Sequence, residues 1–191
     1  RHIRTLDALT GSVRDQFAYS VDGYLTAITD AGGNVTTIQR TGAVATAIVA
    51  PGGFVTTLDV GADGWLQGVT NPAGGAHAMS YYADGMLKTF TDPRAKVHQF
   101  QYDASGRLTR DENPAGGVTT LARVDLSESH YTVTVTTALG MATVYEVEEL
   151  PTGNTRRVRT DPSGAVTESL IRTDGTHRVT YADGTIEDVV L

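Results

Sequence analysis

The sequence predicts an all-β fold made of consecutive antiparallel hairpins with a repeat of about 21 residues. Three observations lead to this prediction: glycine recurs at nearly constant spacing, each repeat holds two turn signals, and the segments between turns are rich in threonine and valine. The 191 residues include 29 Thr, 21 Gly and 20 Val. Because β-branched residues favour strands and glycine favours turns, this composition is typical of strands separated by tight turns.

One marker glycine can be placed in each repeat, and the mean spacing between markers is about 21.6 residues. The markers are Gly11, Gly33, Gly53, Gly75, Gly117, Gly140, Gly164 and Gly184, with Lys96 in the slot between Gly75 and Gly117. A second glycine falls roughly halfway through most repeats. Each repeat is therefore expected to be a two-stranded unit, and strands that return through tight turns pair antiparallel.

Two kinds of turn sequence separate the expected strands. Asp-Gly occurs at Asp22, Asp63, Asp84, Asp174 and Asp183, which predicts type I′ hairpin turns because both residues tolerate positive φ. The other kind is Asn-Pro-Ala-Gly-Gly, at 71–75 and 113–117, in which proline has a fixed φ and the glycines are permissive.

Between turns the alternation of side chains is typical of strands. Within residues 130–137, Tyr131, Val133 and Val135 share one face and threonines take the other. A helical stripe formed by Leu9, Val13 and Phe17 is the competing interpretation for residues 9–17. Thr10, Gly11 and Ser12 interrupt it, so a strand is expected there as well.

The repeats are expected to form one array over residues 1–191, with about eight to nine hairpin units. Residues 66–121 carry the clearest copies of the repeat, and the copies outside this range are weaker. Residues 121–152 keep the spacing but almost none of the motif. This divergent segment is expected to be an insertion, an edge or a contact surface.

The sequence Tyr102-Asp103-Ala104-Ser105-Gly106-Arg107-Leu108-Thr109 resembles the YDxxGRLT signature of the RHS, or YD, repeat proteins. This family includes the bacterial rearrangement-hotspot proteins and the teneurins of animals. Weaker copies begin at Tyr19, Tyr82 and Tyr181. Only one unit has the complete motif with arginine, and the resemblance covers essentially the whole chain.

The resemblance implies an antiparallel sheet that curves or spirals into a hollow shell, of which this chain would be a wall segment. It also implies a non-enzymatic role: enclosing a C-terminal toxin or effector domain of the same RHS polypeptide. The implied partners are therefore the rest of that polypeptide and the enclosed toxin. Self-association through free sheet edges is also expected. The protein would be secreted or at the cell surface, as an exported bacterial protein.

The alternative is an extracellular adhesion module that binds glycans or proteins, with Tyr24, Trp65, Tyr82 and Tyr102 as stacking groups.

Charge and hydropathy argue against several partners. The net charge of −7 does not attract nucleic acid. Arg156, Arg157 and Arg159 lie in an alternating stretch and are interpreted as a solvated strand face. The longest apolar run, Ala43–Ala50, is too short to span a membrane. The first residue is Arg1 and no signal peptide is recognisable, so the chain is expected to be part of a longer protein.

No catalytic, cofactor-binding or metal-binding residue is predicted, and no cofactor is expected. The chain has no cysteine and its five histidines have no metal-ligand spacing. His77 and His98 lie one repeat apart and are interpreted as a cross-strand pair. Asp22, Asp63, Asp84 and Asp103 are expected to cap turns, since the spacing of a calcium loop is missing. Asp161-Pro162-Ser163-Gly164 is interpreted as an ordinary repeat turn, and Asn34 is a formal glycosylation acceptor.

Overall fold

The computed structural model describes residues 1–190, and all regular structure in that range is β-strand. The chain forms two compact units, Arg1–Val97 and His98–Leu191. The prediction of an all-β fold built from antiparallel hairpins is confirmed. Within the range described, no helix is long and apolar enough to cross a membrane.

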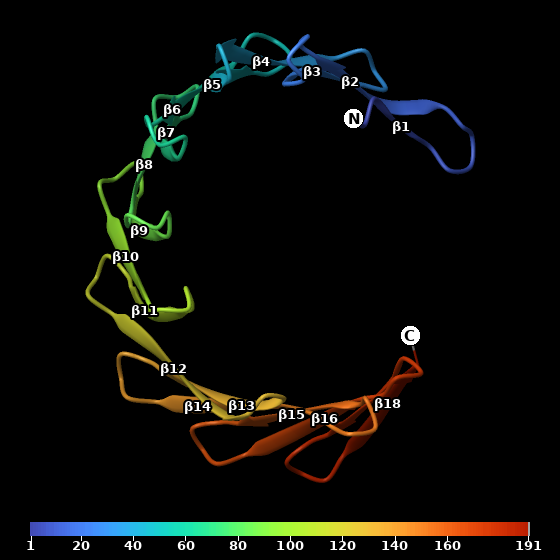
Figure 1. Cartoon of the computed structure of the whole chain (residues 1–191), viewed down its shortest axis with the longest axis vertical. Helices are drawn as coiled ribbons and strands as arrows, with labels where there is room; N and C mark the ends of the chain where they lie inside the picture. Colours follow the sequence, from blue (N-terminus) through green and yellow to red (C-terminus); the bar gives the residue numbers. More distant parts are fainter. Residues whose placement is uncertain (191) are drawn as a thin grey trace. The chain divides into compact units, whose positions relative to one another are not determined.

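The first unit is a meander in which each strand pairs antiparallel with the next (Figure 1). Residues 9–17, the competing helical stripe, lie in a turn and in strand β2. The strands are β1 Arg4–Leu6, β2 Val13–Tyr19, β3 Leu25–Asp30, β4 Val35–Thr41, β5 Val44–Val49, β6 Val55–Val60, β7 Leu66–Thr70, β8 Ala76–Tyr81 and β9 Leu87–Thr91.

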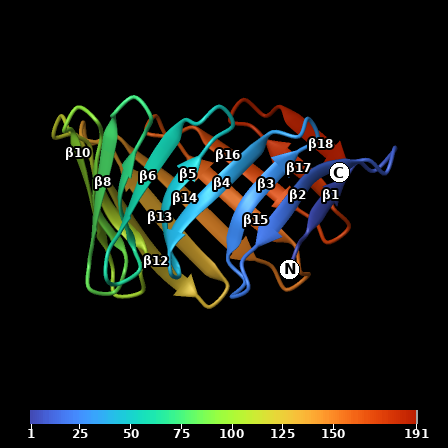
Figure 2. The same ribbon diagram turned by 90° about the horizontal axis from the view of Figure 1, so that it is seen from above.

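The second unit repeats this topology with longer strands in its middle. Its strands also pair antiparallel with their sequence neighbours. Figure 2 shows the strands of each unit side by side, with the turns along two rims. The strands are β10 Val97–Tyr102, β11 Leu108–Glu112, β12 Val118–Ser127, β13 His130–Thr136, β14 Ala142–Glu149, β15 Thr155–Thr160, β16 Val166–Ile171, β17 Thr176–Thr180 and β18 Ile186–Val190.

The Asp-Gly turns are not type I′. In the turn after β8, the Gly85 N–H donates to the Tyr82 carbonyl at 3.0 Å and the Tyr82 N–H donates to the Met86 carbonyl at 2.9 Å. Gly85 has φ 89°, whereas Asp84 does not have a positive φ. Type I′ needs positive φ at both central residues, so the predicted turn type is wrong. The pattern is a three-residue loop with glycine in the left-handed position, and it recurs along both units.

Ala95 is the one residue other than glycine with a positive φ, 58°, among residues 1–190. It closes the turn between β9 and β10, where its N–H donates to the Asp92 carbonyl. The equivalent left-handed residues of the neighbouring turns are Gly74 and Gly116. The Cβ of alanine clashes with the backbone in this conformation, so this turn is strained at the position that glycine normally fills.

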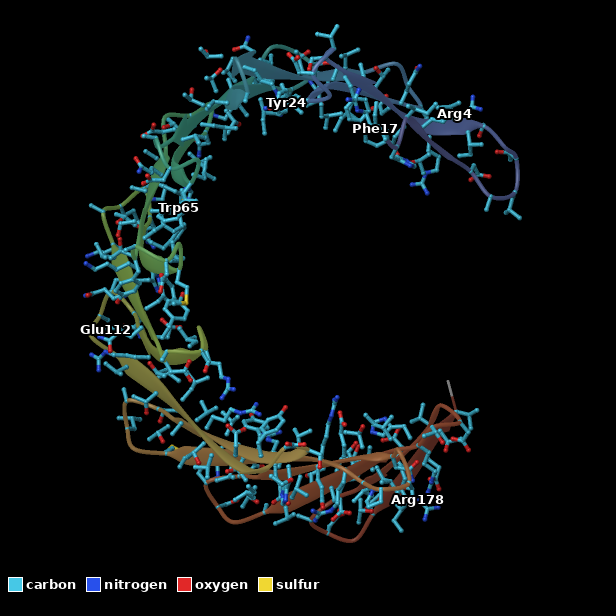
Figure 3. The ribbon with its side chains drawn as sticks, viewed as in Figure 1. Arg4, Phe17, Tyr24, Trp65, Glu112 and Arg178 are labelled. Atoms are coloured by element: carbon cyan, nitrogen blue, oxygen red, sulfur yellow. The ribbon has the colours of Figure 1, made fainter. Side chains whose placement is uncertain are left out.

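The sheet is a single layer with very little fully buried surface. Among residues 1–190, Ala47 is the one buried hydrophobic residue. Strands β4, β6, β8 and β10 alternate between exposed and half-buried residues. In the first unit the half-buried positions form what we call the Phe17 face, which includes Phe17, Ile38, Leu58 and Met79. Figure 3 shows Phe17, Tyr24 and Trp65 on the inner side of this curved sheet.

A β-bulge recurs where each even-numbered strand of the first unit approaches its turn. The register shifts at Ala18/Tyr19, Gln39/Arg40, Asp59/Val60 and Ser80/Tyr81. A bulge bends its strand and increases the local twist. The repeated bulges therefore explain why the sheet of this unit curves (Figure 1).

Candidate functional surfaces

Two tyrosines that lie four residues before a turn glycine tie one repeat to the next, and Tyr81, not Tyr82, is therefore the structural counterpart of Tyr19. Tyr81 lies at the bulge of β8, and its hydroxyl donates to the backbone carbonyl of Leu66 at 2.6 Å. Tyr19 does the same to the carbonyl of His2 at 2.7 Å. A buried or half-buried carbonyl without a partner is costly, so these hydroxyls stabilise the irregular ends of the strands.

At the bulge of β4, Arg40 takes the position that a tyrosine holds in β2 and β8. Its Nε donates to the Leu25 carbonyl at 3.2 Å and its Nη1 to the Ala43 carbonyl at 2.8 Å. Leu25 and Leu66 occupy the same position after their Asp-Gly pairs. This equivalence cannot be recognised from the sequence, because arginine and tyrosine are chemically different side chains that bind carbonyls at equivalent positions.

Trp65 is an intramolecular packing residue. Its ring lies 5.3 Å from the ring of Tyr81, measured between centroids. A Cβ added to Gly85 would lie 3.0 Å from Cζ2 of Trp65, so the indole covers the turn of the next repeat. Trp65, which follows the motif glycine Gly64, therefore contributes to contact between repeats.

The other aromatic residues considered as stacking groups also have intramolecular contacts. The Arg40 guanidinium lies 5.1 Å from the centroid of the Tyr24 ring, and the Lys88 ammonium lies 5.7 Å from that of Tyr82. Tyr24 is 39% exposed. Tyr102 is half-buried at the bulge of β10.

Turn aspartates and asparagines cap their own loops. Oδ1 of Asp103 accepts hydrogen bonds from the N–H groups of Arg107 and Ser105, each at 2.9 Å. The bond from Arg107, followed by that from Ser105, lowers the pKa of the Asp103 carboxyl. Asp84 accepts one bond, from the Met86 N–H at 3.2 Å. The same geometry recurs at Asp30, Asn71, Asp92 and Asn113. The structure gives this capping role to Asp103 and Asp84.

The divergent segment and the two strands that follow it share an ion cluster that the sequence did not predict. The Arg156 guanidinium lies 3.1 Å from Glu146, 3.7 Å from Glu148 and 3.2 Å from Glu168. His130 Nε2 lies 3.0 Å from Glu146 Oε1. The contacts with Glu168 and then Glu146 raise the pKa of Arg156 above its ordinary value. The residues come from β13, β14, β15 and β16, and only the strand register brings them together.

His130, Glu146 and Glu148 have ligand atoms close enough together to hold a metal ion. Arg156 already contacts both carboxylates, and its positive charge opposes a cation at the same place. The residues present therefore fit an ion-paired cluster better than a metal site. His77, one of the two histidines singled out from the sequence, instead stacks on Phe90 with ring centroids 5.4 Å apart.

The three clustered arginines do not share one face. Arg156 lies in the ion cluster. Arg157 and Arg159 are exposed and alternate with half-buried residues along β15. Arg159 lies 2.7 Å from Asp161. The interpretation as a solvated strand face holds for Arg157 and Arg159 but is wrong for Arg156, because its register partners are carboxylates.

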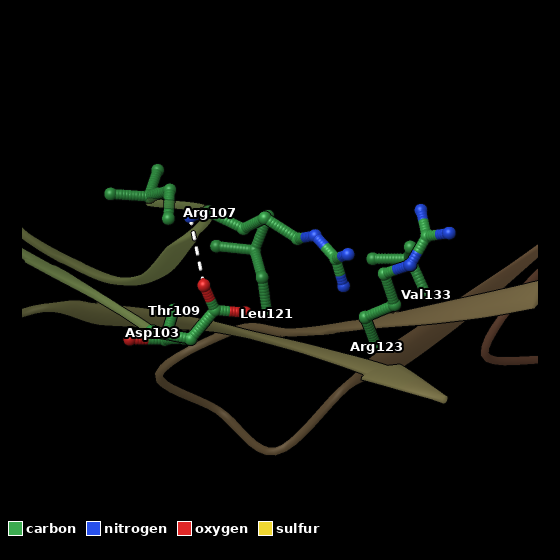
Figure 4. Close-up of a pocket in the computed structure, with 7 residues that line it drawn as sticks. Asp103, Arg107, Thr109, Leu121, Arg123 and Val133 are labelled. Carbon is green, nitrogen blue, oxygen red and sulfur yellow. Dashed lines mark hydrogen bonds between the residues drawn. The ribbon is translucent and has the colours of Figure 1, made fainter. Parts of the chain in front are cut away.

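A pocket of about 250 Å³ lies in the second unit where β11 and β12 separate (Figure 4). Leu108, Leu121 and Val133 supply apolar walls, and charge of both signs comes from Arg107, Arg123 and Asp103. Asp125 lies 3.5 Å from Arg107 and 2.7 Å from Arg123. The Arg123 guanidinium also lies 3.4 Å from the centroid of the Tyr131 ring.

These features define a repeat protein whose hairpins form a thin wall, with side chains that tie neighbouring repeats together. The model of the teneurin YD-shell family matches residues 1–190. The chain belongs to this family, and the resemblance seen in the YD motif is confirmed. The chain is therefore a structural segment of a YD-shell.

Solved structures similar to this chain include the Photorhabdus luminescens Tc holotoxin pore with a mutated TccC3 component. That match has a TM-score of 0.45 and 16% identity and covers 91% of this chain but 9% of the other. The crystal structure of TcdB2-TccC3-TEV matches with a TM-score of 0.29 and 10% identity, over 95% of this chain and 16% of the other. This chain thus spans a small part of either. No curated protein matches the sequence.

Proposed function

We propose that this chain is part of the wall of a shell that encloses a toxin or effector domain at the C-terminal end of the same polypeptide. The observation that carries the proposal is the match of residues 1–190 to the teneurin YD-shell family. In this proposal the longer protein is secreted or displayed at the cell surface, and the wall has no catalytic role of its own.

The construction of the sheet supports a wall. A compact domain of this length would bury many large side chains, whereas here Ala47 is the one buried hydrophobic residue among residues 1–190. Repeat proteins are stabilised by contacts between neighbouring repeats, and the Tyr81 hydroxyl and the Trp65 ring supply such contacts. A thin layer with two accessible faces is suited to separating two compartments.

Protease protection in the full polypeptide tests the proposal. The protein is digested under native conditions, and the survival of the region downstream of the repeats is followed by mass spectrometry. We expect that region to resist cleavage and to become sensitive in the double variant Trp65→Ala/Tyr81→Phe, which loosens contacts between repeats. Tyr145→Phe is the matched control, because Tyr145 is 42% exposed. Equal digestion of the downstream region as an isolated domain and in the intact protein would overturn the proposal.

The alternative of a glycan-binding or adhesion module receives no support from a specific contact. Tyr24, Trp65 and Tyr82 are engaged with Arg40, Tyr81 and Lys88. Binding of a labelled oligosaccharide that is lost in Trp65→Ala but retained in Tyr145→Phe would favour that alternative over the shell.

A further inference from the structure

Five Asp-Gly pairs occupy turns of the same type, and they differ in what holds the aspartate. The aspartates of these pairs are Asp22, Asp63, Asp84, Asp174 and Asp183. In every pair the glycine N–H donates to the backbone carbonyl three residues earlier, at 2.9–3.1 Å. The glycine nitrogen is therefore restrained alike in all five pairs, and the surroundings of the aspartate side chain distinguish them.

Two of the aspartates are firmly capped by the threonine two positions later. Oδ1 of Asp174 accepts hydrogen bonds from the N–H and the hydroxyl of Thr176, at 2.9 and 2.7 Å. Oδ1 of Asp183 accepts a bond from the Thr185 N–H at 2.9 Å. These bonds must break before either carboxyl carbon can move toward the nitrogen of the following glycine.

The carboxyl groups of the other three aspartates are held loosely or not at all. Asp84 accepts one long bond, from the Met86 N–H at 3.2 Å. Among residues 1–190, Asp22 and Asp63 have no hydrogen-bond or ion-pair partner, and both are exposed. Their carboxyl groups therefore rotate freely between staggered rotamers.

The glycine that follows each uncapped aspartate differs in its surroundings. A Cβ placed on Gly23 would collide with the Arg1 guanidinium, so the Arg1 side chain covers the turn after Asp22. Apart from the neighbours of Gly64 in the chain, no described atom lies within 4 Å of a Cβ placed on Gly64. In the range 1–190, Asp63-Gly64 is therefore the one Asp-Gly pair that combines a free carboxyl group with an uncovered glycine.

An Asp-Gly pair can rearrange without an enzyme, because glycine has no Cβ to shield its backbone nitrogen. The Gly64 nitrogen loses its proton and forms a bond to Cγ of Asp63, and the hydroxyl of the protonated carboxyl group leaves as water. Water then adds to one of the two carbonyl carbons of the resulting five-membered ring. Addition at Cγ restores aspartate. Addition at the backbone carbonyl carbon gives isoaspartate, in which the chain runs through Cγ and the α-carboxylate is free.

We propose that Asp63 is a site of spontaneous modification to isoaspartate, ahead of the aspartates in the other four Asp-Gly pairs. The free α-carboxylate of the product is the group that isoaspartyl methyltransferases esterify. The rearrangement inserts a methylene into the backbone directly before Trp65, whose ring lies 5.3 Å from that of Tyr81 between centroids. Isoaspartate at this position therefore displaces the indole and weakens the contact between repeats. The inference does not depend on enclosure of a toxin.

The experiment incubates the full chain at physiological temperature and neutral pH. After denaturation, an endoproteinase that cleaves before aspartate but not before isoaspartate measures the converted fraction at each pair. The chain unfolded in urea gives the intrinsic rate of each pair, by which the native rate is divided. We expect Asp63 to have the highest ratio and Asp174 a ratio at least about fivefold lower, because a hydrogen bond to its carboxyl group must break first.

Two variants change one site each. Asp63→Glu keeps the negative charge, but attack on the glutamate Cδ closes a six-membered ring more slowly, so we expect most of the methyl-accepting product to disappear. Thr176→Val removes the hydroxyl that binds Asp174 while it keeps the shape of the side chain. We expect it to raise conversion at Asp174 about fivefold and to leave Asp63 unchanged. Circular dichroism verifies that both variants are folded.

Trp65 is the only tryptophan of the chain, so its fluorescence reports the displacement of the indole. We expect the emission of the native protein to shift to longer wavelength in step with conversion at Asp63. The Asp63→Glu variant should keep its emission over the same incubation.

The proposal fails if Asp63 does not convert, if all five pairs convert with equal ratios, or if any of the other four converts ahead of Asp63. An emission shift of equal size in Asp63→Glu would overturn the displacement of the Trp65 ring by isoaspartate.

Discussion

The two units have the same topology, but different side-chain interactions hold the repeats together within each unit. In the first unit, the ties between repeats are aromatic rings and hydroxyls, such as Trp65 on Tyr81 and Tyr81 to the Leu66 carbonyl. In the middle of the second unit, the ties are ion pairs centred on Arg156. The same hairpin topology is thus stabilised by aromatic and hydroxyl contacts in one unit and by ion pairs in the other.

The units also differ in the regularity of their pairing. Bulges recur at every even-numbered strand of the first unit, including the end of β8 at Tyr81. From β13 to β18, no register shift interrupts the pairing. Strands β12 and β14 are correspondingly longer, with 10 and 8 residues. In the first unit, the bulges of β2 and β8 lie at tyrosines, whereas those of β4 and β6 lie at Arg40 and Val60. In the second unit, register shifts occur in the pairings of β10 with β11 and of β12 with β13.

Removal of the Trp65 ring should cause the largest difference in stability between the two units. Trp65→Ala is expected to lower the stability of the first unit by about 2–3 kcal/mol, less than for a fully buried tryptophan. Hydrogen exchange should show faster exchange in β6 to β9 and little change in β13 to β16. Trp65→Phe is the control and should retain most of the stability. Uniform loss across both units would contradict the view that contacts act between neighbouring repeats.

A second substitution removes the Arg156 guanidinium from the ion cluster of the second unit. Arg156→Met should destabilise β13 to β16 by about 1–2 kcal/mol, because Glu146, Glu148 and Glu168 then repel each other without compensation. The control is Arg157→Met, at the adjacent exposed position. Urea unfolding followed by hydrogen exchange measures both variants. If the two lose equal stability, the cluster contributes nothing beyond ordinary surface charge.

Removal of one oxygen atom tests how much the hydrogen bond of the Tyr81 hydroxyl contributes to stability. Tyr81→Phe should cost about 1 kcal/mol, since the Leu66 carbonyl loses its hydroxyl donor while the ring remains in place. Tyr145→Phe should be nearly neutral. The measurement is the exchange rate of amides in β7 and β8, and unchanged rates in Tyr81→Phe would show that the hydroxyl has no stabilising role.

Ala95→Gly should produce a small gain in stability, up to about 1 kcal/mol, because glycine adopts the positive φ of 58° without the clash of a Cβ atom. The larger conformational freedom of glycine in the unfolded chain offsets part of this gain. Ala115→Gly, in the same type of turn but without positive φ, is the control and should be destabilising. Thermal unfolding compares the two, and a loss of stability in Ala95→Gly would contradict the strain at this turn.

Low pH should lower the stability of both units by similar amounts, so it is expected to produce the smallest difference between them. The folded pKa values of Asp30, Asp92, Asp103 and Asp174 are lowered below the usual 3.8, because backbone and side-chain donors bind their carboxylates. A lowered pKa contributes stability that is present above the unfolded pKa and is lost as the pH falls through the folded value. We expect stability to decline below about pH 4. Asp103→Asn should reduce that decline, and an unchanged acid transition would contradict the capping role.

Several local features could be predicted from the sequence. The recurrence of glycine and the alternation of Tyr131, Val133 and Val135 predicted the hairpins, and the YD motif at Tyr102 predicted the family. Turn type was predicted wrongly, because the Asp-Gly pair fits both a type I′ turn and a three-residue loop. The difference depends on the number of residues in the loop, which spacing alone does not define.

The sequence by itself determined the repeat, its turns and its strands, since these depend on interactions between residues close in the chain. Only the tertiary structure decided which side chains meet. Arg156 is 10 residues from Glu146 and 12 from Glu168, and Arg40 is 15 from Leu25. Pairing register places these groups opposite one another, and a shift of one residue would turn each side chain to the other face. The pairing of β12 with β11 likewise ends at Arg110↔Thr120, a limit that the spacing of residues does not reveal.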